Sequence, residues 1–400
     1  MRGPGLVLAM CVGEVASLMP LATFPALVPQ FSLAWGLSNT EAGWISGVYY
    51  LGYMLFVPVL VSLTDRIDAR SIFLVSAGVS ALATLGFAIA ADGPWSALFW
   101  RLVAGAGLAG TYMPGLKALT DRGPLANQSR GIALYTASYS VGAGLSFLLA
   151  GIAVDLYGWR GAFYASALGP FLALLIAGTV LRPIAPVQVS AGPLLDFRPV
   201  LRNRAALGYI LAYGGHGFEL MAMRAWIVVF VEFLIGRASH GDPGPWSSTL
   251  VATLVTLIGL PASLLGNEFA IRFGRRGVIV AVMSASALVA CVIGFAASLP
   301  FGLVIGLILL YAVTVTADSG ALTAGAVAAA APEQRGATMA VHSTVGFGAS
   351  FLGPLLVGVA LDLFGGNASL SGWAAAFVTM ALGAAFGPLA LLACRPSERR

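Results

Sequence analysis

The chain has 400 residues, of which 59% are hydrophobic and only 9% are charged, and its mean hydropathy is +0.91. A soluble domain carries about a quarter of its residues charged, so this composition excludes an ordinary water-soluble fold. The formal net charge of +5 follows from arginines in the polar breaks and gives no support for a nucleic-acid partner.

Apolar segments of membrane-spanning length alternate with short polar breaks. Each helical span needs roughly 20 mostly apolar residues. Twelve spans are predicted, over residues 5–30, 42–63, 71–91, 96–119, 131–154, 161–181, 206–231, 249–269, 278–297, 301–327, 337–361 and 373–393. The first is too long for the core of a signal peptide, so we expect it to be retained. The prediction is an all-α, multi-pass membrane protein with twelve transmembrane helices.

The loop arginines are unequally divided by this topology. If both termini are cytoplasmic, nearly all of them lie on the cytoplasmic side, and only Arg160 and Arg237 lie on the other. Cytoplasmic loops of membrane proteins carry an excess of Lys and Arg. We therefore expect a protein of the cytoplasmic (inner) membrane with both termini in the cytoplasm.

The chain contains an internal repeat. Residues 141–148 recur as residues 345–352 with six of eight identical, and the Gly-x-Ala-x-Asp-Leu-aromatic-Gly segment at 151–158 recurs at 358–365. The copies are 204 to 207 positions apart. A shared offset favours duplication over chance, and many transporters are built from such repeats.

A basic, proline-containing stretch separates the two copies. It predicts an N-terminal six-helix bundle at 1–181, a cytoplasmic linker at 182–205 and a C-terminal six-helix bundle at 206–400. Two pseudo-symmetric bundles in one chain suggest a secondary transporter. We expect it to be a monomer.

Two loops carry a family resemblance. Residues 61–70 and 267–276 resemble the Gly-x-x-x-Asp-Arg-x-Gly-Arg-Arg signature of the major facilitator superfamily, and Arg101-x-x-x-Gly105-x-Gly107 is similar to its fourth-helix arginine motif. The resemblance covers the whole chain and implies the two-bundle fold of that superfamily.

Both loops depart from the signature. Val61 and Asp68 replace glycines in the first loop, and Ile271 replaces the aspartate in the second. The gating role that the resemblance implies therefore rests on the first loop. Its candidate gating residues are Asp65, Arg66 and Arg70.

Segments near Tyr213 and Asp318 look like a bacterial subgroup often labelled nitrate/nitrite-transporter-like. Nitrate porters of the superfamily carry an arginine inside the second and eighth helices and asparagine-containing signatures in the fifth and eleventh. Residues 42–63 and 249–269 contain no arginine, and 138–151 and 341–358 contain no asparagine. We therefore do not expect nitrate to be the substrate.

Ionisable side chains inside the spans are few. On insertion scales a charge at the bilayer centre costs about 2.5–3.5 kcal/mol, so each one needs a partner, a water-filled cavity or a function. These residues are Glu14, Arg101, His216, Glu219, Arg224, Asp318 and His342. All but His342 lie on the first, fourth, seventh and tenth helices, which by the resemblance line a central cavity. An offset of 205 pairs Glu14 with Glu219.

Two interpretations compete for these groups. In the functional one, the substrate-binding residues are Arg224, Arg101, His216, Glu219, Tyr112 and Trp226. The proton-coupling residues are then Glu219, Asp318 and Glu14. In the structural one, the charges pair internally, for example Glu219 with Arg224, and only stiffen the bundle.

The leading hypothesis is proton-coupled symport of a small organic solute, more plausibly an anion, by alternating access. One alternative is proton-coupled efflux of hydrophobic or cationic compounds, and another is a non-transporting membrane sensor or assembly factor. The expected partners are the small-molecule substrate, protons and the lipid bilayer. The sequence has no phosphate-binding glycine loop, no His/Cys ligand cluster and no nucleophile beside a base, so neither enzymatic activity, a cofactor nor a metal site is expected.

Overall fold

A computed structural model describes residues 4–122, 128–185, 197–237, 246–331 and 334–394. Within these ranges the regular structure is helical and no strand occurs. The chain divides into two compact units, one of residues 1–30 and 48–195 and the other of residues 31–47 and 196–400. The prediction of an all-α fold is confirmed.

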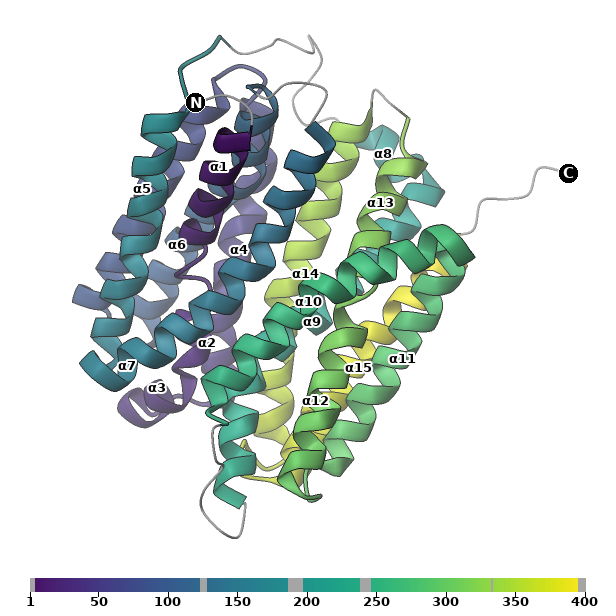
Figure 1. The fold of residues 1–400 in the computed structure, drawn as a ribbon. Helices are drawn as coiled ribbons and strands as arrows, with labels where there is room; N and C mark the ends of the chain where they lie inside the picture. Colours follow the sequence, from purple (N-terminus) through teal and green to yellow (C-terminus); the bar gives the residue numbers. More distant parts are fainter. Residues whose placement is uncertain (1–3, 123–127, 186–196, 238–245, 332–333, 395–400) are drawn as a thin grey trace, which may run out of the picture. The chain divides into compact units, whose positions relative to one another are not determined.

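The first unit is built around five helices. They are α1 (Pro4–Ser17), α2 (Thr23–Ala26), α5 (Ala69–Ala90), α6 (Pro94–Thr120) and α7 (Gln128–Val180). Helix α5 packs on α6 and α7, and α1 packs on α7, so the helices run side by side as a bundle (Figure 1). Within α7, Gly158 has a φ of 68° and breaks the helix there, because only glycine adopts this conformation freely.

The second unit is a larger helical bundle. Its helices are α8 (Arg198–Arg202), α9 (Arg204–Arg237), α10 (Ser248–Phe273), α11 (Arg275–Ala296), α12 (Phe301–Thr316), α13 (Ser319–Ala329), α14 (Arg335–Leu363) and α15 (Leu370–Ala393). Helix α9 packs on α14 and α15, and α15 packs on α11. The central position of α9 explains why most of its residues are buried.

Helices α3 (Val28–Trp35) and α4 (Asn39–Leu63) are each divided between the units. Residues 31–47 group with the second unit, where the Asp362 carboxylate accepts hydrogen bonds from the Asn39 and Thr40 amides at the start of α4. Residues 186–196 of the predicted linker at 182–205 lie outside the described residues, and its described part includes α8 and the first residues of α9.

Two predicted spans are interrupted. The helix expected over 5–30 ends at Ser17 and resumes at Thr23, and the helix expected over 301–327 breaks at Ala317 and Asp318. Hydropathy does not register the first break, because residues 18–22 are all apolar. Pro20 is the local cause available in the sequence, since proline has no N–H to continue a helix.

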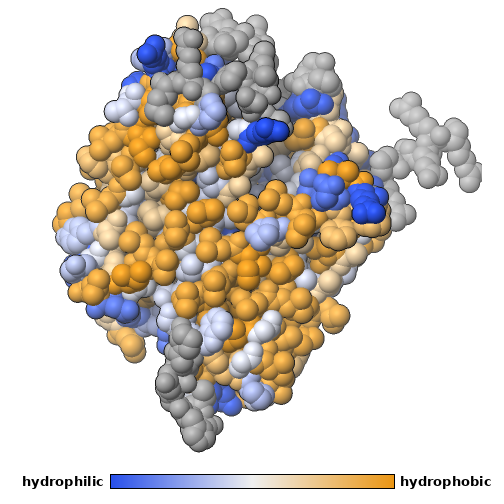
Figure 2. Space-filling model, in the orientation of Figure 1, coloured by the Kyte–Doolittle hydropathy of each residue, from blue (hydrophilic) through white to orange (hydrophobic). Residues whose placement is uncertain are grey.

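The outward faces of the helices are apolar. Large hydrophobic side chains such as Leu33, Leu156 and Phe295 are exposed, and hydrophobic residues cover much of the visible surface in Figure 2. In the described part of the chain, eight helical segments are long and apolar enough to cross a membrane, with the α12–α13 segment counted as one. A bilayer is the environment in which such a surface is stable.

Candidate functional site

In the first unit, Glu14 is fully buried on α1. Its Oε2 accepts a hydrogen bond from the Tyr135 hydroxyl at 2.8 Å and lies 3.4 Å from Ser17 Oγ. The same tyrosine hydroxyl lies 3.0 Å from the Thr111 carbonyl oxygen of α6. Glu14 Oε1 has no hydrogen-bond partner among the described residues. Only one of the two carboxylate oxygens therefore has hydrogen-bond partners in the described part of the chain. These hydrogen bonds link α1, α6 and α7.

Arg101, on α6, is also fully enclosed. Its Nη1 and Nη2 donate to the carbonyl oxygens of Pro20 and Leu21, at 3.0 and 3.3 Å. Its guanidinium lies 4.3 Å from the centre of the Tyr49 ring. A helix that breaks inside a membrane leaves carbonyls that need donors, and Arg101 supplies them for the turn between α1 and α2. Its two terminal nitrogens therefore have a structural role, while Nε has no hydrogen-bond partner among the described residues.

The two candidate aromatic residues pack against helices. The Tyr112 ring lies 5.2 Å from the Tyr139 ring and 6.3 Å from the Tyr135 ring. Trp226 is buried, and its Nε1 donates to the Pro354 carbonyl oxygen at 2.9 Å. The Trp226 indole therefore satisfies a backbone acceptor on α14.

In the second unit, Glu219 is buried on α9. Its Oε1 accepts a hydrogen bond from Ser286 Oγ of α11 at 2.8 Å, and the Tyr311 hydroxyl of α12 also interacts with it. Asp318 acts on it electrostatically. The Glu219–Arg224 pair that the sequence left open does not occur among the ion pairs of the described residues. Five residues along an α-helix turn the chain by about 140° beyond a full turn, so the two side chains leave α9 on different sides.

His216 and Asp318 come together from separate helices. His216 Nδ1 of α9 lies 2.8 Å from Asp318 Oδ1 at the break between α12 and α13, and each residue is only 2% exposed. Among the described residues, neither of these two atoms has a hydrogen bond to any other group. The carboxylate and the imidazole are thus placed to share or exchange a proton.

Aromatic stacking extends this contact. The Tyr213 ring lies 5.4 Å from the His216 ring and 3.8 Å from the His342 ring. His342 Nε2 lies 3.4 Å from Thr323 Oγ1. His342, predicted to lie away from the cavity-lining helices, therefore reaches the same cluster through Tyr213.

Arg224 has two donor nitrogens without a partner, whereas Arg101 has one in the described part of the chain. Arg224 is 5% exposed, and its Nε and Nη1 have no hydrogen-bond partner within the described ranges. The Tyr213 side chain is close enough to interact electrostatically with both Arg224 and Asp318. A guanidinium enclosed in this way, with open donors, is able to bind an anion in bidentate fashion.

The candidate gating loop lies between α4 and α5. Arg70 Nε donates to the Leu181 carbonyl oxygen at 2.7 Å, and its Nη2 donates to that of Gly178 at 3.1 Å, so Arg70 caps the end of α7. Asp65 is half-buried and Arg66 is exposed, and neither occurs in the ion pairs of the described residues. Of the three predicted gating residues, the structure gives only Arg70 a defined set of contacts.

Asp68 is the central carboxylate of this loop, and the sequence analysis did not select it. Both its oxygens accept from Arg122 Nη2 at 2.7 Å, and the amides of Arg70 and Ile184 donate to it at 3.0 Å. Partial burial alone would raise the pKa of Asp68, but the hydrogen bonds from Arg122 and the two amides outweigh it and lower the pKa. The available signal was an aspartate directly before a helix, where it acts as an N-cap.

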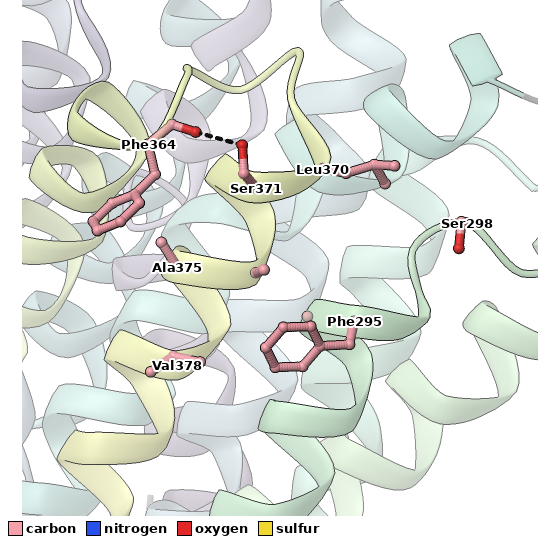
Figure 3. A pocket seen from close by; sticks show the side chains of 9 residues that line it. Phe295, Ser298, Phe364, Leu370, Ser371, Ala375 and Val378 are labelled. Carbon is pink, nitrogen blue, oxygen red and sulfur yellow. Dashed lines mark hydrogen bonds between the residues drawn. The ribbon is translucent and has the colours of Figure 1, made fainter.

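A cavity of about 560 Å³ lies elsewhere in the second unit, between the end of α11 and the start of α15. Figure 3 shows Phe295, Leu370 and Val378 around it, with the Ser371 hydroxyl donating to the Phe364 carbonyl oxygen at 2.8 Å. No candidate site residue lines this cavity. Its lining is largely apolar and contains no charged residue.

The fold and the buried charges define a helical membrane transporter. The family model described as Major Facilitator Superfamily matches residues 10–242, more than half of the chain. The chain belongs to the major facilitator superfamily, which confirms the resemblance found in the loop motifs.

Individual relatives are distant. The chain is 23% identical over 211 residues to an Arabidopsis thaliana protein named as a probable sphingolipid transporter, spinster homolog 2, and spans 43% of that protein's length and 48% of its own. It is 24% identical over 273 residues to an uncharacterized MFS-type transporter of Yersinia pestis (strain Pestoides F), with 67% of each chain covered. The nitrate-like subgroup label stays a prediction.

Solved structures share the fold. A crystal structure of a bacterial homolog to the human lysosomal transporter Spinster, in an inward-facing and occupied conformation, matches with a TM-score of 0.80 at 17% identity over all of both chains. The nucleoside transporter NupG matches with a TM-score of 0.73 at 15% identity, over 97% of this chain and 98% of that one. At these identities the likeness shows the fold alone.

Proposed function

We propose that this superfamily transporter moves a small organic anion across the cytoplasmic membrane by alternating access, in symport with protons. The observation that carries the proposal is Arg224, a buried guanidinium with two open donor nitrogens. An unpaired charge inside a membrane protein is costly, and such charges mark substrate or ion pathways. A carboxylate or phosphate group on the solute supplies the missing acceptor.

Arginine suits this role better than the other groups of the site. Its planar fork matches a carboxylate or phosphate bidentately, which fixes the orientation of the solute as well as its charge. Arg101 has its donors on the carbonyls of Pro20 and Leu21, so we assign it to structure. Tyr112 and Trp226, which pack against neighbouring helices of their own units, are likewise assigned to structure.

Protons enter through the carboxylates. Asp318, in contact with His216, is the primary coupling group of the proposal, and Glu219 beside Ser286 is the second. Tyr213 interacts electrostatically with both Asp318 and Arg224, so protonation of Asp318 removes a negative charge from the surroundings of the anion site. Glu14, the repeat counterpart of Glu219, is the coupling candidate of the first unit.

A ligand screen followed by reconstitution tests the proposal. The purified protein is heated with classes of metabolites at two pH values, since a ligand that binds the folded state raises the unfolding temperature. Active compounds are then tested in proteoliposomes for solute-dependent proton movement. Stabilisation by anions and proton entry with the solute support the proposal. Stabilisation only by cations, or transport without proton movement, contradicts it.

A second candidate, proton-coupled efflux of hydrophobic or cationic compounds, has its own support. Glu14 Oε1 is a buried carboxylate oxygen without a partner in the described part of the chain, and it suits a cationic group. The Arabidopsis relative is named for sphingolipids, which are hydrophobic. The same screen separates the two candidates. The Arg224→Gln variant should still bind an efflux substrate, whereas the Glu14→Gln variant should not.

If the protein is a non-transporting sensor or assembly factor, bound solutes should stabilise it without crossing the membrane.

We further propose a monomer with both termini in the cytoplasm. Labelling of single cysteines at either end with an impermeant reagent in intact cells tests the orientation.

A further inference from the structure

The turn between α10 and α11 gathers three arginines in five residues. Arg272 lies in the last turn of α10, and Arg275 and Arg276 begin α11. Gly274 makes the turn with a φ of 95° and offers no side chain to cap α11. The positive end of a 22-residue helix therefore coincides with three cationic side chains.

Acidic partners do not neutralise this turn. No ion pair in the described ranges includes any of the three arginines, and the nearest acid along α10, Glu268, is exposed. The Nε atoms of Arg275 and Arg276 are buried without a hydrogen-bond partner in the same ranges. The positive charge of this turn is therefore not balanced by acidic side chains of the described residues.

The equivalent turn of the first unit shows what the second one lacks. There, Asp68 accepts from Arg122, and Arg70 caps the end of α7. An offset of 206 places Arg276 at the position of Arg70, and Arg276 likewise donates to a carbonyl at the end of α15, that of Leu391. The same offset places Gly274 where Asp68 stands. Arg276 is therefore explained, while Arg272 and Arg275 are left without an acid.

Apolar side chains surround this charge. Phe269, Ile271 and Phe273 are 55%, 61% and 63% exposed, and the Arg272 guanidinium lies 5.5 Å from the centre of the Phe273 ring. In Figure 2, hydrophilic surface meets hydrophobic surface where α10 ends. A soluble anion needs no such apolar border, but a lipid places its charged headgroup directly above its acyl chains.

We propose that the α10–α11 turn binds the phosphate group of an anionic phospholipid, with Arg272 and Arg275 on the phosphate and Phe269 and Phe273 against the acyl chains. The site is independent of the proposed substrate site on α9. It makes the second unit sensitive to the lipid composition of the membrane.

A lipid titration tests this site. Short-chain phosphatidylglycerol or phosphatidylcholine is added to the full-length protein in detergent, and the unfolding temperature is followed. Phosphatidylglycerol should stabilise the wild type, and the double substitution Arg272→Gln with Arg275→Gln should weaken the apparent affinity about fivefold for each arginine. Arg237→Gln is the matched control, because Arg237 also stacks on a phenylalanine at a helix end, 5.6 Å from Phe233.

The outcomes separate a lipid site from its alternatives. An unchanged phosphatidylglycerol response in the double variant overturns the proposal. Equal stabilisation by inorganic phosphate also overturns it, because a soluble anion would then be the ligand. Should the double variant fold poorly, the single substitution of the exposed Arg272 replaces it, and the affinity for phosphatidylglycerol should fall about fivefold. An undiminished affinity contradicts the assignment.

Discussion

Arg101 in the first unit and Arg224 in the second are both arginines enclosed within a helical bundle, yet their surroundings differ. Arg101 donates to two carbonyls of a broken helix and lies over the Tyr49 ring. Arg224 keeps Nε and Nη1 without a partner in the described part of the chain. One buried arginine uses its terminal nitrogens on the backbone of its own unit, whereas the other keeps two donor nitrogens open.

The repeat sharpens this contrast. At an offset of 205, Glu14 corresponds to Glu219, and both carboxylates accept a hydroxyl hydrogen bond at 2.8 Å. At the same offset His216, Asp318 and Arg224 correspond to the uncharged residues Cys11, Met113 and Met19. The duplication kept one carboxylate in each unit, whereas His216, Asp318 and Arg224 have no charged counterparts in the first unit. This difference supports the proposal that the solute binds in the second unit.

The largest expected effect is on stability, from Arg101→Gln. The substitution leaves the carbonyls of Pro20 and Leu21 without charged donors, and we expect a loss of about 3 kcal/mol in the free energy of unfolding. Denaturation in detergent measures it. A fully stable Arg101→Gln protein that loses only solute binding would erase the contrast between the two arginines.

Asp318→Asn should uncouple transport from protons. An amide keeps the size of the side chain and a hydrogen bond to His216 but cannot take up a proton. We expect proton-driven uptake to fall at least about tenfold, while solute exchange without a proton gradient continues. Both rates are measured in proteoliposomes. Glu14→Gln is the companion variant, because Glu14 is the coupling candidate of the first unit, and an equal loss there would place coupling in both units.

Asp68→Asn should change the pH dependence of stability. Because the folded-state pKa of Asp68 lies below its unfolded value of about 4, its contribution is complete above that value and disappears as the pH falls through the folded pKa. An asparagine keeps the helix cap but loses the ion pair with Arg122, at a cost of about 1–2 kcal/mol at neutral pH.

Unfolding of wild type and variant at several pH values measures this effect. The two curves should converge below pH about 4. Asp65→Asn provides the control and should leave the curve unchanged. If Asp65→Asn changed the pH dependence of stability more than Asp68→Asn does, Asp65 and not Asp68 would be the central carboxylate of this loop.

The smallest effect is expected from Trp226→Phe. The variant loses the hydrogen bond to the Pro354 carbonyl oxygen, so the free energy of unfolding should fall by about 1 kcal/mol. Solute affinity should change little. A large loss of affinity with unchanged stability would make Trp226 a substrate contact.

Sequence patterns were sufficient for the helical fold and for the identity of the buried charges. Periodicity and hydropathy do not show which charges meet: Asp68 and Arg122 are 54 positions apart, and His216 and Asp318 come from different helices. The separation of Glu219 from Arg224, by contrast, follows from helix geometry and was open to prediction. The role of Arg101 depends on the break after Ser17, which an apolar run conceals.

Arg224 is the proposed anion-binding residue. The most direct measurement is the thermal stabilisation of wild type, Arg224→Gln and Arg224→Lys by an anionic solute identified in the screen. We expect Arg224→Gln to fold, because Nε and Nη1 have no hydrogen-bond partner to lose within the described residues. Its affinity for the solute should fall about 100-fold, with partial recovery in Arg224→Lys. A folded Arg224→Gln protein that binds the anion as tightly as wild type would contradict this role of Arg224.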